Sequence, residues 1–161
     1  KLNFMGNELG SFDEWNESRS LAWNLNTFPK HDSIAHLIVD LNNIYKSYKA
    51  MYIEEHNPER FSWLMADNAD QSVYAFRRIC GLEELIFVFN MTPNYYEYIN
   101  IPLINSGVYE EILNTDKDVY GGNNLYNGLP CESSPGSFEG LPHHMTIKLS
   151  SYTACIFKKI K

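Results

Sequence analysis

The sequence predicts a mainly β protein, with a C-terminal antiparallel β-sandwich preceded by a front part that holds one amphipathic helix. Two observations predict this class. Aromatic residues make up 14% of the 161 residues, and most fall in short runs bounded by glycine, proline, asparagine and aspartate, as in strands and turns. Residues 34–48 differ, because their apolar side chains recur with the period of a helix.

The predicted helix spans Ile34–Tyr48. Its apolar positions recur at i, i+3, i+4 and i+7, which places them in one stripe along the helix. Asp32 or Ser33 can accept hydrogen bonds from the first free backbone N–H groups, so we expect the helix to be capped there. Residues 7–30 show no sustained period and predict a long irregular connection with one helical turn at most.

Beyond the helix the apolar period changes to two, which indicates strands. The run Leu85–Phe89 is continuously apolar, as expected of a central strand covered on both faces. Residues 67–70 have the turn chemistry of a hairpin, and residues 117–140 predict a long loop. The predicted strands are Phe61–Ala66, Ser72–Cys80, Glu84–Met91, Tyr96–Ile101, Val108–Leu113, His144–Leu149 and Thr153–Ile160.

The chain is expected to divide into a front part, residues 1–50, and a sandwich domain, residues 51–161. A lone helix leaves its apolar stripe exposed, so the front part should belong to a larger body. The first residue, Lys1, opens directly into an apolar stretch. This start is what a segment cut from a longer chain would show.

Charge and composition argue against two classes of partner. Thirteen Lys and Arg against 20 Asp and Glu give a net charge of −7, so nucleic acid and anionic membranes are poor partners. The longest apolar run, residues 85–89, is far shorter than the ~20 residues that span a bilayer. Three widely spaced cysteines, Cys80, Cys131 and Cys155, fit free thiols in a reducing compartment, so a cytoplasmic protein is expected.

No catalytic group emerges from the residues themselves. Most paired carboxylates are neighbours in the chain, and neighbours on a strand point to opposite faces. His31 and His36 are five residues apart and do not share a helix face, and His143 and His144 would diverge from a strand. We therefore expect no catalytic residue, no metal site and no cofactor in this chain.

Aromatic side chains are the remaining signal. Trp15 and Trp23 lie in the irregular connection, where they could stack against sugar rings. Trp63 lies in a predicted strand, where a place in the sandwich core is the more common role. Both interpretations stay open at this point.

Several ordered motifs then point to one family. The front part contains LNFMGNELG at residues 2–10, EWN at 14–16, SLAW at 20–23 and DLNNIY at 40–45. The later part contains FSW at 61–63, SVYAF at 72–76, FNMTP at 89–93, LNTD at 113–116 and YGG at 120–122. Together they closely resemble the C-terminal third of 1,4-α-glucan (glycogen) branching enzymes of the α-amylase superfamily, glycoside hydrolase family 13, over essentially the whole chain.

The resemblance implies that residues 2–6 are the eighth strand of a truncated (β/α)₈ barrel and that Ile34–Tyr48 is its final helix. Active sites of such barrels lie at the C-terminal ends of the strands, so Gly6, Asn7 and Glu8 would face the cleft. Trp15 and Trp23 would be further substrate-binding residues. The family's catalytic carboxylates belong to earlier strands, so none is assigned here.

Three hypotheses follow. The resemblance favours the C-terminal piece of a glycogen branching enzyme, inactive alone, whose partners are α-glucan and the missing barrel portion. The alternative is a free-standing α-glucan-binding sandwich that uses Trp15 or Trp63. The third is a structural module in which the exposed helix stripe mediates a dimer, or else folds back on the sandwich.

Overall fold

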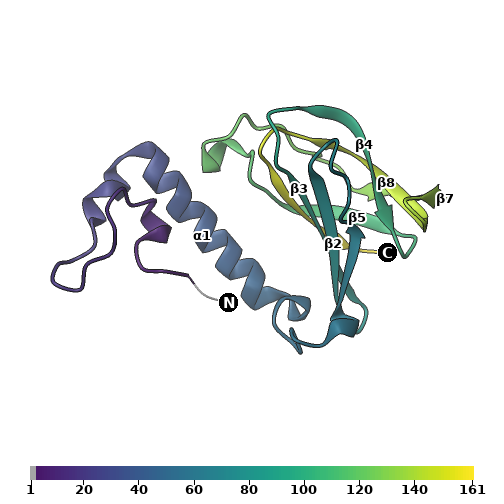
Figure 1. Cartoon of the computed structure of the whole chain (residues 1–161), viewed down its shortest axis with the longest axis horizontal. Helices are drawn as coiled ribbons and strands as arrows, with labels where there is room; N and C mark the ends of the chain where they lie inside the picture. Colours follow the sequence, from purple (N-terminus) through teal and green to yellow (C-terminus); the bar gives the residue numbers. More distant parts are fainter. Residues whose placement is uncertain (1–2) are drawn as a thin grey trace.

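In the computed structural model, which describes residues 3–161, one long helix lies against a two-sheet sandwich (Figure 1). The helix α1 (Pro29–Ser47) is preceded by the 3-10 turns η1 (Asn7–Leu9) and η2 (Trp23–Thr27). Two further turns, η3 (Lys49–Met51) and η4 (Pro58–Arg60), connect it to the first strand. The front turns lie on the side of α1 that faces away from the sandwich (Figure 1).

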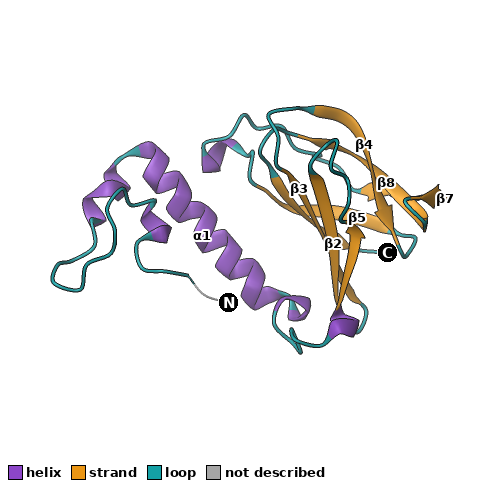
Figure 2. Ribbon diagram, viewed as in Figure 1, coloured by secondary structure: helices purple, strands orange, loops and turns teal. Residues whose placement is uncertain are grey.

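All strand pairs of the sandwich are antiparallel, which confirms the predicted class (Figure 2). Sheet A has six strands in the order β1-β2-β3-β9-β5-β6, and sheet B has three in the order β4-β8-β7. The strands are β1 (Phe61–Met65), β2 (Val73–Cys80), β3 (Glu83–Asn90), β4 (Tyr96–Leu103), β5 (Val108–Asn114), β6 (Cys131–Glu132), β7 (Ser134–Phe138), β8 (Leu141–Leu149) and β9 (Ala154–Lys159).

The two hairpins at the start of sheet A follow from local chemistry. Residues 67–70 lie in the connection between β1 and β2, as predicted. Between β2 and β3, Cys80 pairs with Glu83 across a two-residue turn. Gly81 at its first position has φ 60°, the left-handed value that a type II′ hairpin requires there. The two-residue turn at Gly81 therefore fixes the register of β2 against β3.

Strand β3 is covered on both faces, as its continuous apolar run predicts. Ile86 and Val88, both 0% exposed, belong to the core between the two sheets. Leu85 and Phe87, at 0% and 6% exposed, point to the opposite face. This outer face of sheet A therefore needs a cover of its own.

The helix supplies that cover. Ile44 is buried in the cluster that contains Leu85 and Phe87, and Leu37 and Leu41 pack against it half-buried. The apolar stripe thus folds back on the sandwich over the C-terminal half of α1. Among the described residues, no helix has the length and apolarity that crossing a membrane would take.

The helix begins earlier than the apolar period indicates. It starts at Pro29, and the preceding Phe28 makes no side-chain cap. The predicted cap at Asp32 or Ser33 is therefore wrong. Proline suits the first helical position because its φ is already helical and its missing N–H would have no partner there.

Two strands lie inside the segment that was predicted to be one long loop. Strands β6 and β7 fall within residues 117–140, and β7 pairs with β8 at an edge of sheet B. Strand β7 contains Pro135 and Gly136 and buries no residue, so it has neither strand composition nor alternation. An edge position tolerates proline because a missing N–H costs nothing on the open side.

The strand expected at residues 2–6 is not found in its described part. Residues 3–6 form no strand, and Gly6 already belongs to the turn before η1; Leu2 lies outside the described residues. A strand exists only through hydrogen bonds to a neighbour. No described segment pairs with residues 3–6.

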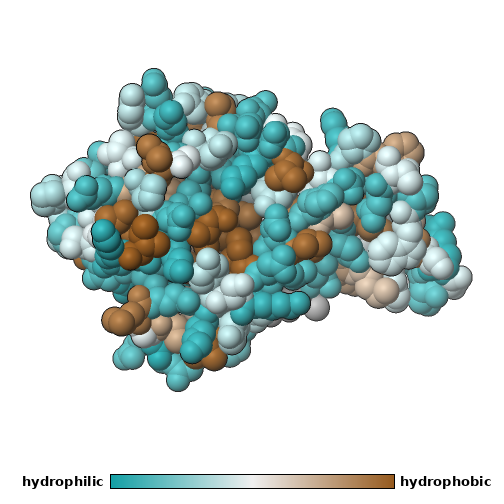
Figure 3. Space-filling view, turned by 180° about the vertical axis from the view of Figure 1, so that it is seen from behind, coloured by the Kyte–Doolittle hydropathy of each residue, from teal (hydrophilic) through white to brown (hydrophobic). Residues whose placement is uncertain are grey.

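Apolar side chains on the surface are distributed unevenly. Seen from behind, the molecule has several separate apolar patches divided by hydrophilic side chains (Figure 3). In the front part, by contrast, most large apolar side chains before the helix are exposed. They are Phe4, Met5, Phe12, Trp15, Trp23 and Phe28.

Truncating Ile44 tests whether the helix is docked. We expect Ile44→Ala to lower the free energy of unfolding by about 2–4 kcal/mol, because it leaves a cavity against sheet A. Val39, which is 56% exposed, provides the matched control, and Val39→Ala should change the free energy by about 0.5 kcal/mol or less. Urea denaturation measures both. Equally small effects would show that α1 does not pack on the sheet.

Candidate functional site

The front part contains a tight turn that two glycines make possible. Gly6 (φ 97°) precedes η1 and Gly10 (φ 57°) follows it, and both angles lie in the left-handed region that favours glycine. Leu9 within the turn is 1% exposed. The Gly6 backbone N–H donates to Glu8 Oε2 over 3.1 Å, so the Glu8 carboxylate closes the turn.

Helix α1 holds this turn in place. His31 Nδ1 donates to the Leu9 carbonyl oxygen over 2.7 Å, and the Phe12 ring meets the His31 ring edge-on with centroids 5.1 Å apart. A Cβ at Gly10 would lie 2.7 Å from Ile34 Cδ1, so the turn is in close contact with the helix at this point. The position of the turn therefore follows the position of α1.

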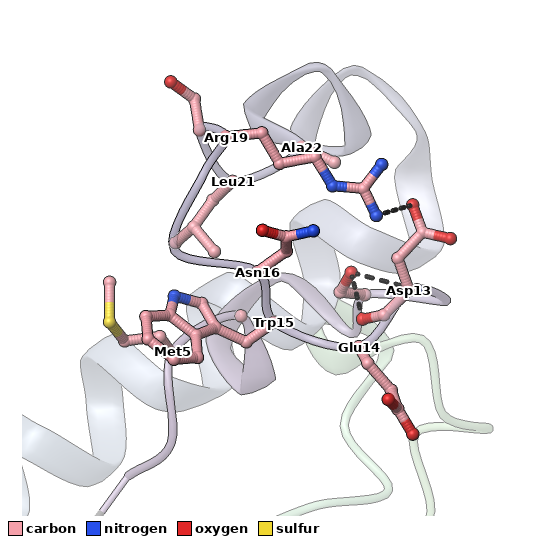
Figure 4. Close-up of a pocket in the computed structure, with 11 residues that line it drawn as sticks. Met5, Asp13, Glu14, Trp15, Asn16, Arg19, Leu21 and Ala22 are labelled. Carbon is pink, nitrogen blue, oxygen red and sulfur yellow. Dashed lines mark hydrogen bonds and ion pairs between the residues drawn. The ribbon is translucent and has the colours of Figure 1, made fainter.

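A hollow lies beside the turn, within the connection between η1 and η2 (Figure 4). The Trp15 ring meets the Phe4 ring edge-on, with centroids 6.0 Å apart. Arg19 Nη2 lies 3.9 Å from Asp13 Oδ2, and the Glu14 carboxylate points away from that of Asp13 (Figure 4). The hollow thus presents one aromatic ring and several exposed polar groups.

These groups can bind a polar ligand, but they do not form an acid–base pair. Glycoside hydrolysis uses two carboxyl groups, about 5–9.5 Å apart, that face one bond. Asp13 is turned toward Arg19, and Glu14 points elsewhere. Within residues 3–161, no cluster of three or more His, Cys, Asp or Glu side chains is placed to hold a metal ion.

The structure brings together most of the substrate-binding residues suggested by the sequence. Gly6, Asn7 and Trp15 line a second hollow at the turn, which adjoins the hollow of Figure 4 and shares Gly6 and Trp15 with it. Gly6 is buried there and Trp15 is 41% exposed. Glu8 is half-buried in the same turn. Trp23 lies in η2, 58% exposed, and does not line the hollow.

Sequence reasoning did not find Asp13 and Arg19 as a pair. They face each other across an irregular loop, six residues apart. No periodicity and no motif in the sequence indicates such a contact. Only the path of the loop around the hollow reveals it.

A second aromatic feature lies on the sandwich. The Trp63 side chain on β1 is 56% exposed, and it meets Phe61 and Phe76 edge-on at 5.3 and 5.8 Å between centroids. Trp63 therefore belongs to the outer face of sheet A and not to the core between the sheets. Its exposed ring is available to a flat ligand.

The fold and these features define a class: an antiparallel two-sheet sandwich preceded by one docked helix and a glycine-framed turn. The family model described as "Alpha amylase, C-terminal all-beta domain" matches residues 63–160. The chain therefore belongs to the α-amylase C-terminal all-β domain family.

Individual relatives are branching enzymes. The 1,4-alpha-glucan branching enzyme GlgB of Oceanobacillus iheyensis is 37% identical over 160 residues, covering 98% of this chain and 25% of that enzyme. The GlgB of Rhizobium meliloti is 41% identical over 129 residues, covering 80% of this chain and 18% of that enzyme. The resemblance to branching enzymes is confirmed, and the chain spans about a quarter or less of these relatives.

A solved structure agrees with the architecture. The debranching enzyme of Nostoc punctiforme aligns with a TM-score of 0.60 over 96% of this chain and 27% of that chain, at 19% identity. At this identity the likeness shows the fold alone. It covers the front part as well as the sandwich.

Proposed function

We propose that this chain acts as the C-terminal part of a glycogen branching enzyme, which cleaves an α-1,4 glucan and transfers the freed chain to a 6-hydroxyl. The observation that carries the proposal is the 37% identity to one such enzyme over 98% of the chain. In this function the reaction retains configuration through a carboxylate nucleophile and an acid/base glutamate. Glycogen synthesis would place the protein in the cytoplasm.

Within that enzyme, residues 1–50 would be the end of the catalytic barrel and residues 51–161 its C-terminal sandwich. The exposure of the front part supports this division. Of the described residues before α1, only Gly6 and Leu9 are buried, whereas Phe12 is 85% exposed. A barrel would cover this apolar surface, which water otherwise contacts at a cost in free energy.

The hollow at η1 would then lie at the C-terminal end of the eighth strand, where barrel enzymes bind substrate. Gly6 and Asn7 would border the glucan, and Trp15 would offer its ring to a sugar face. Glu8 would hold the turn through the Gly6 N–H. Trp23 would contact substrate farther from this hollow.

The chain alone is expected to be inactive, because the catalytic carboxylates would belong to earlier barrel strands and because Asp13 and Glu14 at the hollow do not converge on one bond. Incubation with amylose should give no α-1,6 linkages by proton NMR. The complete Oceanobacillus iheyensis enzyme under the same conditions is the positive control. Branching by the isolated chain would contradict the proposal.

The exposed Trp63 favours a second candidate, an α-glucan-binding sandwich that works without the barrel. This function predicts that maltooligosaccharides bind the isolated chain and that Trp63→Ala or Trp15→Ala abolishes binding. Tyr98 on sheet B, 74% exposed, is the control, since Tyr98→Ala should leave binding unchanged. Isothermal titration measures each variant, and an absence of binding by the unmodified chain would remove this candidate.

A dimer through the helix stripe is the remaining structural hypothesis. The packing of Leu37, Leu41 and Ile44 on sheet A leaves less of the stripe for a second copy. Ile34 and Val39 remain 37% and 56% exposed. A barrel or a second copy would have to use this narrower surface.

A further inference from the structure

The junction between helix and sandwich contains one completely buried residue. Ala50 is 0% exposed and lies in η3, between the end of α1 and the start of β1. Its neighbour Met51 is 8% exposed and belongs to the same apolar cluster as Leu85. Because the junction lies away from water, the peptide groups of Ala50 need partners within the protein.

Two charged side chains on the sheet provide these partners. The Ala50 N–H donates to Glu83 Oε1 over 2.6 Å, and Arg78 Nε donates to the Ala50 carbonyl oxygen over 2.8 Å. Arg78 is on β2 and Glu83 is on the neighbouring β3. Both bonds are charge-assisted, which makes them stronger than bonds between neutral groups.

Removing either side chain would leave one buried backbone group of Ala50 without a hydrogen-bond partner. Arg78 Nη2 is also buried, with no hydrogen-bond partner among the described residues, and the guanidinium's bond to Ala50 is made through Nε. A buried peptide group left without a partner carries the full cost of its desolvation. The two charges therefore fix the backbone of Ala50 more firmly than apolar packing alone would.

A second tie lies farther along the helix. Tyr120, in the 3-10 turn η5 (Asp118–Tyr120) of the sandwich, donates to Asp40 Oδ2 over 2.5 Å. Burial raises the pKa of Tyr120, and the hydrogen bond to Asp40 raises it further. Asp40 is near the middle of α1 and Ala50 just beyond its end. Two ties at separate points determine the direction of a stiff helix.

We propose that Arg78 and Glu83 are positioning residues. They bind the backbone N–H and carbonyl group of Ala50 and thereby make helix α1 and the sandwich one rigid body. Glu83 holds the N–H, Arg78 holds the carbonyl group, and the bond from Tyr120 to Asp40 fixes the helix direction. This goes beyond the proposed function, since it requires neither glucan nor barrel. If a barrel is present, the same grip sets its angle to the sandwich.

Hydrogen exchange by mass spectrometry on the whole 161-residue chain tests this coupling. We expect Glu83→Ala, and separately Arg78→Met, to speed exchange of peptides covering residues 41–51 by roughly tenfold or more, the effect of losing one charge-assisted bond. Peptides from β3 and β9 should keep their protection. Glu83→Gln should restore much of the protection, because its amide oxygen can still accept from the Ala50 N–H.

Two control variants remove similar charges elsewhere. Glu110 is exposed on β5, and its side chain forms no hydrogen bond or ion pair among the described residues. Arg60 forms an ion pair with Glu54 in the exposed part of the linker. Glu110→Ala and Arg60→Met should leave exchange over residues 41–51 unchanged. If Glu83 and Arg78 only stabilised the fold as a whole, their substitution would instead speed exchange in all peptides by a similar factor.

Three results would overturn the proposal. The first is unchanged exchange over residues 41–51 in both Glu83→Ala and Arg78→Met. The second is an equal loss of protection across the sandwich in these variants. The third is that Glu83→Gln exchanges as fast as Glu83→Ala. If Glu83→Ala does not fold, the exchange rates of Arg78→Met and Tyr120→Phe still test the proposal. Tyr120→Phe should speed exchange around Asp40 and leave β3 unchanged, and no change there would contradict the second tie.

Discussion

The structure depends on the two-sided burial of β3. One face of this strand closes the core between the sheets through Ile86 and Val88, and the other face carries Leu85 and Phe87. A sheet that is apolar on both faces needs a second cover, because about 25 cal/mol is lost for each Å² of apolar surface left in water. Helix α1 is that cover, so the front part and the sandwich are connected through a shared core.

The position of the candidate site follows from this packing. Ile44 anchors the C-terminal half of α1 on sheet A, while His31 and Ile34 at its other end hold the turn that contains Gly6 and Gly10. The turn is not in contact with the sandwich, yet the packing of α1 on the sandwich determines where the turn lies. In this arrangement the packing of the helix on the sandwich sets the position of a candidate site that the sandwich does not touch.

Sequence patterns within a few neighbouring residues predicted the elements whose formation depends on those residues alone. The helical period over residues 34–48, the alternation of β2 and the glycine of the turn at Gly81 are each contained within a few neighbouring residues. Strand β7 could not be predicted, because Pro135 and Gly136 give it no strand signal and its pairing with β8 depends on the complete sheet. The start of α1 was missed because residues 29–33 contain no large apolar side chain that would extend the helical period.

The site shows the same division between local and distant effects. The motif around Gly6 indicated residues 6–8 as a candidate site but not their turn, and the attachment of that turn to α1 joins Leu9 to His31, 22 residues apart. The grip on Ala50 joins residues 28 and 33 positions apart, and nothing in the periodicity of either segment indicates it. Distant contacts of this kind appear only when the sheet and the helix are placed together.

The direct test of the central claim is the distance between α1 and sheet A in solution. Spin labels at Val39→Cys and Leu82→Cys would occupy exposed positions, 56% and 102% exposed, in a chain whose half-buried Cys80 and Cys131 are replaced by serine and whose buried Cys155 is kept. Pulsed electron paramagnetic resonance should then give one narrow distance distribution, as expected of a docked helix. A broad distribution that extends to longer distances would show that α1 moves freely and would contradict the account.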